Sequence, residues 1–178
     1  MRYAALLRGV NLGPSRRMPM AELREVIARL GFEDVATYLQ SGNAVFDAAD
    51  DAADFKPRLE AAISDRFGML VGVVVLSAPE MEQVVRACPY PGAAEEDPTK
   101  VHVTFIDPPL DDGLQIEVDL EPFLPDEFQS AAGVVYMHLP DGMGRSKLPA
   151  ALGKALKDKL VTTRNWRTVK ALAEMLTG

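Results

Sequence analysis

The order of apolar patterns over the first 76 residues is the feature that most limits how this chain can fold. Residues 3–8 form an apolar run that leads into a loop of glycine, asparagine, proline and serine, as a buried strand does. Residues 20–30 have apolar side chains at helical spacing, with Pro19 in the first turn and Gly31 at the C-cap. This beginning predicts a strand followed by an amphipathic helix.

Two short strands, a second helix and a further strand are predicted up to residue 76. Residues 35–39 and 44–47 are strand-like, and the intervening Ser41-Gly42-Asn43 makes them either one kinked strand or a hairpin. Residues 54–67 have the pattern of an amphipathic helix, and residues 71–76 are rich in β-branched side chains. The resulting β-α-β-β-α-β order is that of the ferredoxin-like motif. It predicts that the first and last of these strands are neighbours in a sheet that contains antiparallel pairs, with both helices on one face.

The second half has a related order of elements. We expect a helix over residues 79–87, a strand over 101–106, a hairpin of 127–131 and 134–139 joined at Gly133, and two closing helices. Residues 89–98 are rich in proline, glycine and acidic side chains and mark the internal boundary, and a short helix is expected at 114–118. The predicted fold class is therefore α+β, with a ferredoxin-like half (1–88) and a second, related α/β half (89–178) in one compact unit.

Composition excludes several classes of protein. The chain is 48% hydrophobic and 25% charged, which is usual for a soluble globular protein, and its apolar runs are too short to span a membrane. Arg8 interrupts the first apolar run too early for a secretory signal, and the single cysteine, Cys88, excludes an internal disulfide. We therefore expect a cytoplasmic protein.

The net charge of −7 is distributed unevenly. Residues 1–35 contain six basic and four acidic side chains and residues 143–178 contain eight and two, whereas residues 36–142 contain five and twenty. An acidic protein of this kind is a poor general nucleic-acid binder. If the two basic ends fold together, they form one positive patch; the alternative is that surface charge merely varies along the chain.

Four polar clusters lie at the ends of predicted elements, where a rigid scaffold usually presents a binding site. They are RGVNLG (8–13), YLQSGN (38–43), GRSK (144–147) and TTRNWRT (162–168). Arg8 is either a clamp for a carboxylate or phosphate or the partner of an internal carboxylate. The segment around Gly42 is either a bulge that re-aims side chains or a hairpin turn with left-handed Asn43.

The two later clusters each precede or open a predicted helix. Ser146 is placed to cap one helix and Asn165 or Thr163 the other, so each cluster is either a simple cap or an anion site beside a helix N-terminus. Arg164 near a helix N-terminus is unfavourable unless an anion is present. Trp166 is expected to be a core anchor rather than a platform for stacking a base.

No motif identifies a reaction, a cofactor or a metal. Ser41 has no base supplied by the sequence pattern, and the loop after Arg8 lacks the terminal residues of a phosphate-binding Walker loop. His102 and His138 could face each other across a sheet, but without a nearby carboxylate or cysteine cluster they are expected to be structural.

The motifs LLRGVNLG, MAELREVIARLGF, TYLQSGNAVF and the late GRSK and TTRNWRTV together resemble those of the bacterial domain-of-unknown-function 1697 family. The resemblance runs nearly end to end and is loose only over residues 89–126. It implies an α+β fold with ferredoxin-like halves and implies no activity. The positions corresponding to shared motifs are Arg8, Gly9, Asn11, Gln40, Ser41, Gly42, Asn43, Arg145, Ser146, Lys147, Arg164, Asn165 and Trp166.

These observations predict that the protein binds a small ligand carrying a phosphate or carboxylate in a polar, arginine-containing cleft. The alternatives are an RNA- or DNA-binding module and a structural or protein-interaction domain without a ligand. Whether the protein is an enzyme is left open, and neither a membrane nor a cofactor is predicted. The predicted ligand-binding residues are Arg8, Asn11, Gln40, Ser41, Asn43, Arg145, Ser146, Lys147, Arg164 and Asn165.

Overall fold

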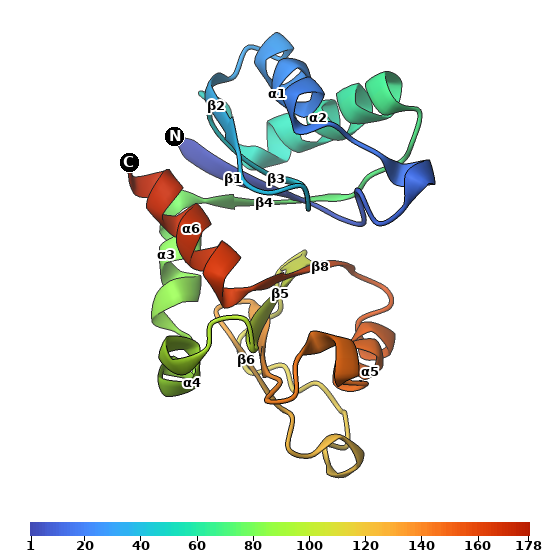
Figure 1. Ribbon diagram of the computed structural model, residues 1–178. Coiled ribbons are helices and arrows are strands. Elements are labelled where there is room, and N and C mark those ends of the chain that lie inside the picture. Colours follow the sequence, from blue (N-terminus) through green and yellow to red (C-terminus); the bar gives the residue numbers. More distant parts are fainter. The chain divides into compact units, whose positions relative to one another are not determined.

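The computed structural model describes all 178 residues, which fall into two compact units (Figure 1). The first unit consists of Met1–Glu82 and Ala171–Gly178, and the second of Gln83–Lys170. Helices α3 (Ala78–Arg86) and α6 (Trp166–Thr177) each contribute residues to both units. Each unit contains one four-stranded antiparallel sheet.

The first unit has the predicted ferredoxin-like order. Its elements are β1 (Arg2–Leu7), α1 (Met20–Arg29), β2 (Glu33–Thr37), β3 (Asn43–Asp47), α2 (Ala52–Phe67) and β4 (Val73–Ser77). The strand order is β2-β3-β1-β4, and every pair is antiparallel. The predicted neighbours β1 and β4 are confirmed, because Tyr3 pairs with Ser77 and Leu7 with Val73.

Both helices cover one face of this sheet, also as predicted. Alternate residues of a strand point to the same face, and Tyr3, Ala5 and Leu7 of β1 share one core with Leu23 of α1 and Leu59 of α2. Aromatic rings fill the centre of that core: Phe32 stacks on Phe46 with ring centroids 4.9 Å apart, and Phe55 meets both edge-on. Burial of this apolar face holds α1 and α2 on the sheet.

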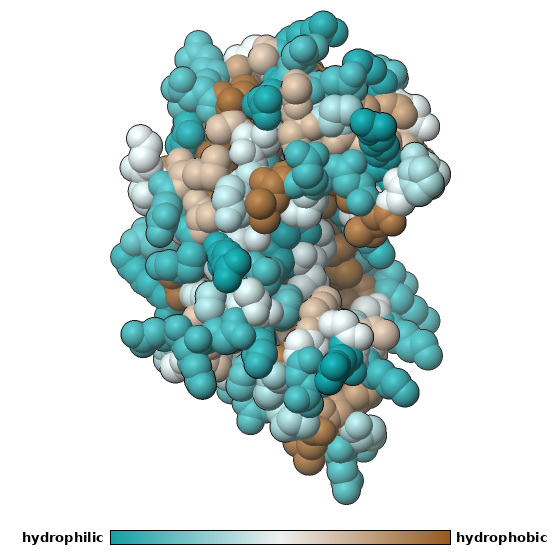
Figure 2. All heavy atoms as spheres, in the orientation of Figure 1, coloured by the Kyte–Doolittle hydropathy of each residue, from teal (hydrophilic) through white to brown (hydrophobic).

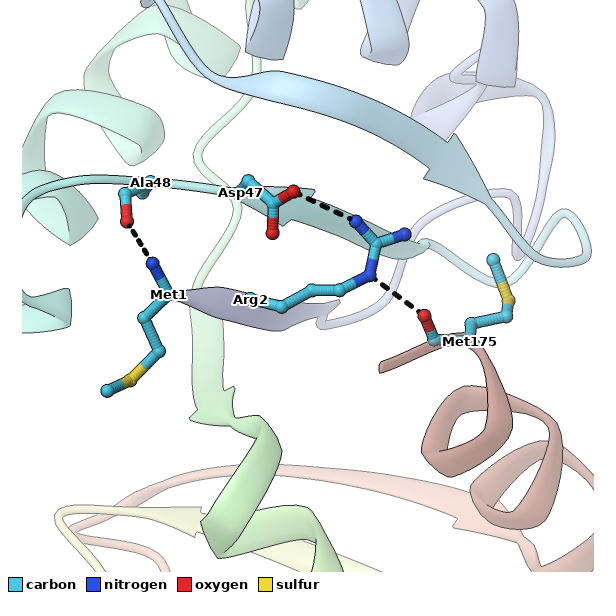
Figure 3. A network of polar contacts seen from close by, with 5 residues as sticks. All are labelled: Met1, Arg2, Asp47, Ala48 and Met175. Carbon is cyan, nitrogen blue, oxygen red and sulfur yellow. Dashed lines mark hydrogen bonds and ion pairs between the residues drawn. The ribbon is translucent and has the colours of Figure 1, made fainter. Parts of the chain in front are cut away.

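The last turns of α6 also belong to the first unit. The Arg2 Nε donates a hydrogen bond of 2.8 Å to the Met175 carbonyl, while its guanidinium lies 3.3 Å from the Asp47 carboxylate (Figure 3). Beside them, the N-terminal amine of Met1 donates to the Ala48 carbonyl at 2.8 Å. The chain's two ends are thus attached at the same part of the first unit.

The second unit repeats the strand order of the first. Its elements are α4 (Pro91–Glu96), β5 (Val101–Asp107), β6 (Glu127–Ala131), β7 (Val134–His138), α5 (Leu148–Ala155) and β8 (Leu160–Asn165). Its sheet has the order β6-β7-β5-β8, which corresponds strand for strand to β2-β3-β1-β4. The predicted α+β class, with a second half related to the first, is confirmed.

The predicted helix at residues 114–118 is wrong. Residues 108–120 have no regular structure, and a short 3-10 turn follows at Glu121–Phe123. Ile116, Val118 and Leu120 pack on the core beside α5, while the residues between them are exposed. This alternation has the period of extended chain and not of a helix. An extended segment therefore occupies the place in the chain order that α1 has in the first unit.

Three other expectations were incomplete or wrong. Residues 91–96 of the predicted connection form α4, and β8 was not expected at all. His102 pairs with Met137 and His138 with Val101, so the two histidines point to opposite faces of the sheet and do not form a pair. None of the helices has both the length and the apolar character needed to cross a membrane.

Hydrophilic side chains predominate on the face of the molecule shown in Figure 2. The strongly exposed apolar residues include Leu12 and Leu70, which lie in the loops after β1 and before β4.

Candidate functional site

The loop between β1 and α1 is fixed by the side chain of Asn11. Asn11 has a left-handed backbone (φ 55°), and its Nδ2 donates to the carbonyls of Met18 at 2.9 Å and Gln40 at 2.6 Å. Its Oδ1 accepts the Met18 amide at 2.7 Å. Both donors of the amide are used within the protein, so Asn11 positions this loop against the β2–β3 turn rather than donating to a ligand.

Arg16 and Gly42 complete the connection between neighbouring loops. The Arg16 Nε donates to the Gly9 carbonyl at 2.5 Å, and its second nitrogen donates to the Leu70 carbonyl at 3.1 Å. Gly42 has φ 85°, and a Cβ there would lie only 2.6 Å from the Val10 side chain. The turn therefore needs glycine, both for its backbone conformation and for the close approach of the loop after β1.

A pocket of about 360 Å³ opens beside these loops. It is lined by Asn11, Arg17, Met18, Pro19, Met20, Ala21, Arg24 and Gln40. Two predicted site residues, Asn11 and Gln40, are thus brought to one pocket although they are distant in the sequence. Arg17 and Arg24 add two positive charges, and no carboxylate lines the pocket.

The pocket also includes the start of α1. The residue before the helix is Pro19, and no side chain caps the first turn. The first amides of a helix have no acceptor within it and carry partial positive charge. The acidic residue of this turn, Glu22, pairs with Arg66 of α2 at 3.0 Å and so directs its charge toward that helix. Helix amides and arginines together are suited to an anion.

The two arginines differ in their protein contacts. The Arg24 guanidinium donates to the Thr37 hydroxyl at 2.6 Å, whereas Arg17 is exposed and forms no hydrogen bond or ion pair. Arg17 can therefore turn to a ligand without breaking any interaction of the fold.

The other predicted residues of the first unit lie outside this pocket. Arg8 is exposed at the end of β1, and its guanidinium forms no hydrogen bond or ion pair. Asn43 is fully buried at the start of β3, where its Nδ2 donates to the Tyr38 carbonyl at 2.8 Å and to the Ser41 hydroxyl at 2.9 Å. The alternative of a left-handed Asn43 is wrong, because Leu39 (φ 57°) and Gly42 have that conformation.

The GRSK cluster lines a different pocket, in the second unit. The Ser146 hydroxyl accepts the Leu148 amide at 3.1 Å beside the start of α5, but the residue directly before the helix is Lys147, which provides no side-chain cap. Arg145 and Lys147 flank it and are exposed. This pocket has a volume of about 470 Å³ and is also lined by Asp126 and Asp141.

The TTRNWRT cluster forms the strand β8 and the start of α6. The Asn165 Oδ1 accepts the Thr168 amide at 3.0 Å, which confirms this residue as a helix cap. Arg164 is buried and donates to the Thr162 hydroxyl at 2.7 Å and the Thr163 carbonyl at 2.9 Å, and burial lowers its pKa to about 10. Arg164 pairs with Val103 of β5, so it points to the sheet face opposite the one that α5 covers.

Sequence reasoning missed Arg17 and Arg24 as site residues. Arg17 directly precedes Met18 and Pro19 at the helix start, and Arg24 lies four residues after Met20, which places both near the N-terminus of α1. Two arginines on either side of an uncapped helix start were the available signal. The structure contains no group of three or more histidine, cysteine, aspartate or glutamate side chains that could hold a metal ion.

The fold and the pocket define an α+β protein of two antiparallel sheets with the same strand order, whose first unit has a positively charged pocket at the start of α1. The profile of the DUF1697 family, proteins of unknown function, matches residues 1–136, and the chain belongs to this family. The match ends before the GRSK and TTRNWRT clusters, so their correspondence to family motifs stays a prediction.

A solved structure shows the same fold. The conserved bacterial protein SP0830 from Streptococcus pneumoniae is similar over 99% of this chain and 98% of its own, with a TM-score of 0.74 and 22% identity. At this identity the likeness concerns the fold alone. No curated protein matches the chain.

Proposed function

We propose that the protein binds a small molecule through its phosphate or carboxylate group at the N-terminus of α1. The observation that carries this proposal is the pocket formed by Arg17, Arg24, Gln40 and the uncapped first turn of the helix. Two cations and no carboxylate line this pocket in a protein with a net charge of −7. The local charge favours an anion even though the whole molecule does not.

A small ligand fits this pocket better than a nucleic-acid strand. Its volume of about 360 Å³ lies in the range of small-molecule sites, about 300–1,000 Å³. Its lining contains no aromatic side chain on which a base would stack. Arg8, exposed on the adjoining loop, is available to a part of the ligand that extends beyond the pocket.

The first test measures thermal unfolding with increasing inorganic phosphate at constant ionic strength. We expect phosphate to raise the melting temperature, because a ligand that binds only the folded state stabilises it by mass action. Arg17→Met should leave the ligand-free protein within about 0.5 kcal/mol of the parent, as for a surface position without partners. It should lower the phosphate affinity about tenfold, because a charge-assisted hydrogen bond is lost.

The matched control is Arg29→Met, which removes one positive charge at the C-terminal end of α1, away from the helix start that Arg17 precedes. Arg29 pairs only with Glu25, at 3.8 Å, and does not line the pocket. Equal phosphate responses of the Arg17 and Arg29 variants would refute the site. Tight binding of single-stranded RNA with a steep salt dependence, in the same buffers, would favour the nucleic-acid alternative.

A further inference from the structure

The second unit contains a pocket with a different charge pattern. One wall consists of residues 122–125, two prolines on either side of Phe123 and Leu124, which precede β6. The other wall consists of residues from the segment between β7 and α5, together with Asp126. Its volume of about 470 Å³ is again that of a small-molecule site.

Asp126 is a buried carboxylate in this wall with unused acceptor capacity. Its residue is only 6% exposed, and the Ser146 hydroxyl donates to its Oδ2 at 2.6 Å. No donor of the protein reaches its Oδ1. The Oδ1 does not belong to the fully buried side-chain atoms without a partner, so this oxygen is open to solvent and keeps its acceptor capacity. Since Asp126 lines the pocket, a ligand can supply the missing donor.

The cations of the pocket are equally available. Arg145 and Lys147 are exposed and form no ion pair with Asp126 or Asp141, although all four side chains line the same space. The two positive and two negative side chains cancel, so a simple anion meets repulsion as well as attraction. A ligand that offers an anionic group to the cations and a donor to Asp126 is complementary to both.

We propose that this pocket binds a small molecule that carries a phosphate or carboxylate and, a short distance away, a hydroxyl or ammonium group. The anionic group binds Arg145 and Lys147, and the hydroxyl or ammonium donates to the Asp126 Oδ1. A purely structural role of Asp126, holding the Ser146 hydroxyl beside the start of α5, uses only Oδ2, so Oδ1 and the two exposed cations are open to a ligand in the same pocket. The proposal does not depend on the site in the first unit.

The test is an amide ¹H–¹⁵N NMR titration of the full chain with four probes. Inorganic phosphate supplies only the anion and glycerol only the hydroxyls, whereas glycerol 3-phosphate and 4-aminobutyrate each supply an anion with a donor. We expect one of the last two to shift the amides of Ser146, Lys147 and Leu148 with an affinity at least about tenfold above phosphate and glycerol, as for one added hydrogen bond to a charged group. The tighter of the two shows which combination the pocket prefers, a phosphate with a hydroxyl or a carboxylate with an ammonium.

Variants separate the site from the structural role. Asp126→Asn keeps an oxygen for Ser146 but presents an amide to the pocket, so it should remove the tenfold preference while the amide spectrum stays dispersed. Arg145→Met, at an exposed position without partners, should weaken binding of both two-group probes, and Asp112→Asn, at an exposed position that does not line the pocket, should change nothing. The proposal is overturned if phosphate alone saturates these amides as tightly, if neither two-group probe saturates them, or if Asp126→Asn retains the preference.

Discussion

At the scale of single residues, some polar side chains form hydrogen bonds within the protein, whereas others have no protein partner and can contact a ligand. Asn11 and Asn43 were predicted to bind a ligand, yet the side-chain amide of each donates its hydrogen bonds to other groups of the protein. Arg17, which no sequence motif marked, makes no such contact. The sequence identified the loops correctly because glycine and asparagine mark turns. It could not tell which side chains remain free, since that depends on neighbours distant in the chain.

Gly42 gives a prediction at this scale. Gly42→Ala should destabilise the protein by about 2–5 kcal/mol, because the left-handed backbone costs a residue with a Cβ about 1–2 kcal/mol and overpacking costs about 1–3 kcal/mol. The new methyl would lie 2.6 Å from Val10 and 2.8 Å from the Leu7 Cβ. Denaturation in urea, followed by circular dichroism, measures the loss.

Gly31 is the matched control for this substitution. It has φ 89°, close to that of Gly42, and nothing lies within 4 Å of the place that a Cβ would take. Gly31→Ala should therefore cost only the backbone contribution of about 1–2 kcal/mol. If the two substitutions destabilise equally, the close approach of the two loops at Gly42 is not real.

At the scale of elements, the spacing of apolar residues correctly predicted the helices of the first unit. It failed where a segment fits both a helical and an extended pattern. The helices of the first unit have clear spacing of three and four residues, and both formed. Residues 114–120 have apolar side chains at every second position, and those of Ile116, Val118 and Leu120 pack as extended chain beside α5. The strand β8 was missed because its β-branched residues Val161, Thr162 and Thr163 directly precede a strong helix pattern.

Hydrogen exchange tests the extended segment. The amides of Gly113, Gln115 and Glu117 belong to exposed residues and have no hydrogen-bond acceptor, so they should exchange nearly as fast as in an unstructured chain. The amide of Leu110, which donates to the Gly133 carbonyl at 3.1 Å, should be protected. Uniform protection across residues 114–118 would instead indicate the helix that the structure lacks.

At the scale of the molecule, the chain contains two sheets of the same strand order, but the segments that connect their first two strands differ. In the first unit a helix lies between the first two strands along the chain, and its uncapped N-terminus contributes to a pocket with two arginines. In the second unit an extended segment takes this place, and the pocket near it contains cations and carboxylates in equal number. That the predicted ligand-binding residues of both halves share one cleft stays a prediction, and each unit has a pocket of its own lined by some of them.

The charge distribution along the chain predicted only part of this arrangement. The basic N-terminal segment does contain the arginines of the first pocket. The basic C-terminal segment, however, distributes its charges between an exposed pair at residues 145 and 147 and the buried Arg164. A count of charges cannot separate these positions, because burial is decided by the sheet face to which each side chain points.

An amide NMR titration of the full chain with inorganic phosphate at constant ionic strength tests the anion site at the N-terminus of α1. We predict saturating shifts of the amides of Met20, Ala21 and Glu22 in the first turn of α1, with one common affinity, and their loss in Arg17→Met but not in Arg29→Met. Shifts that increase linearly across the whole surface, or that saturate only at amides away from this turn, would contradict an anion site at the N-terminus of α1.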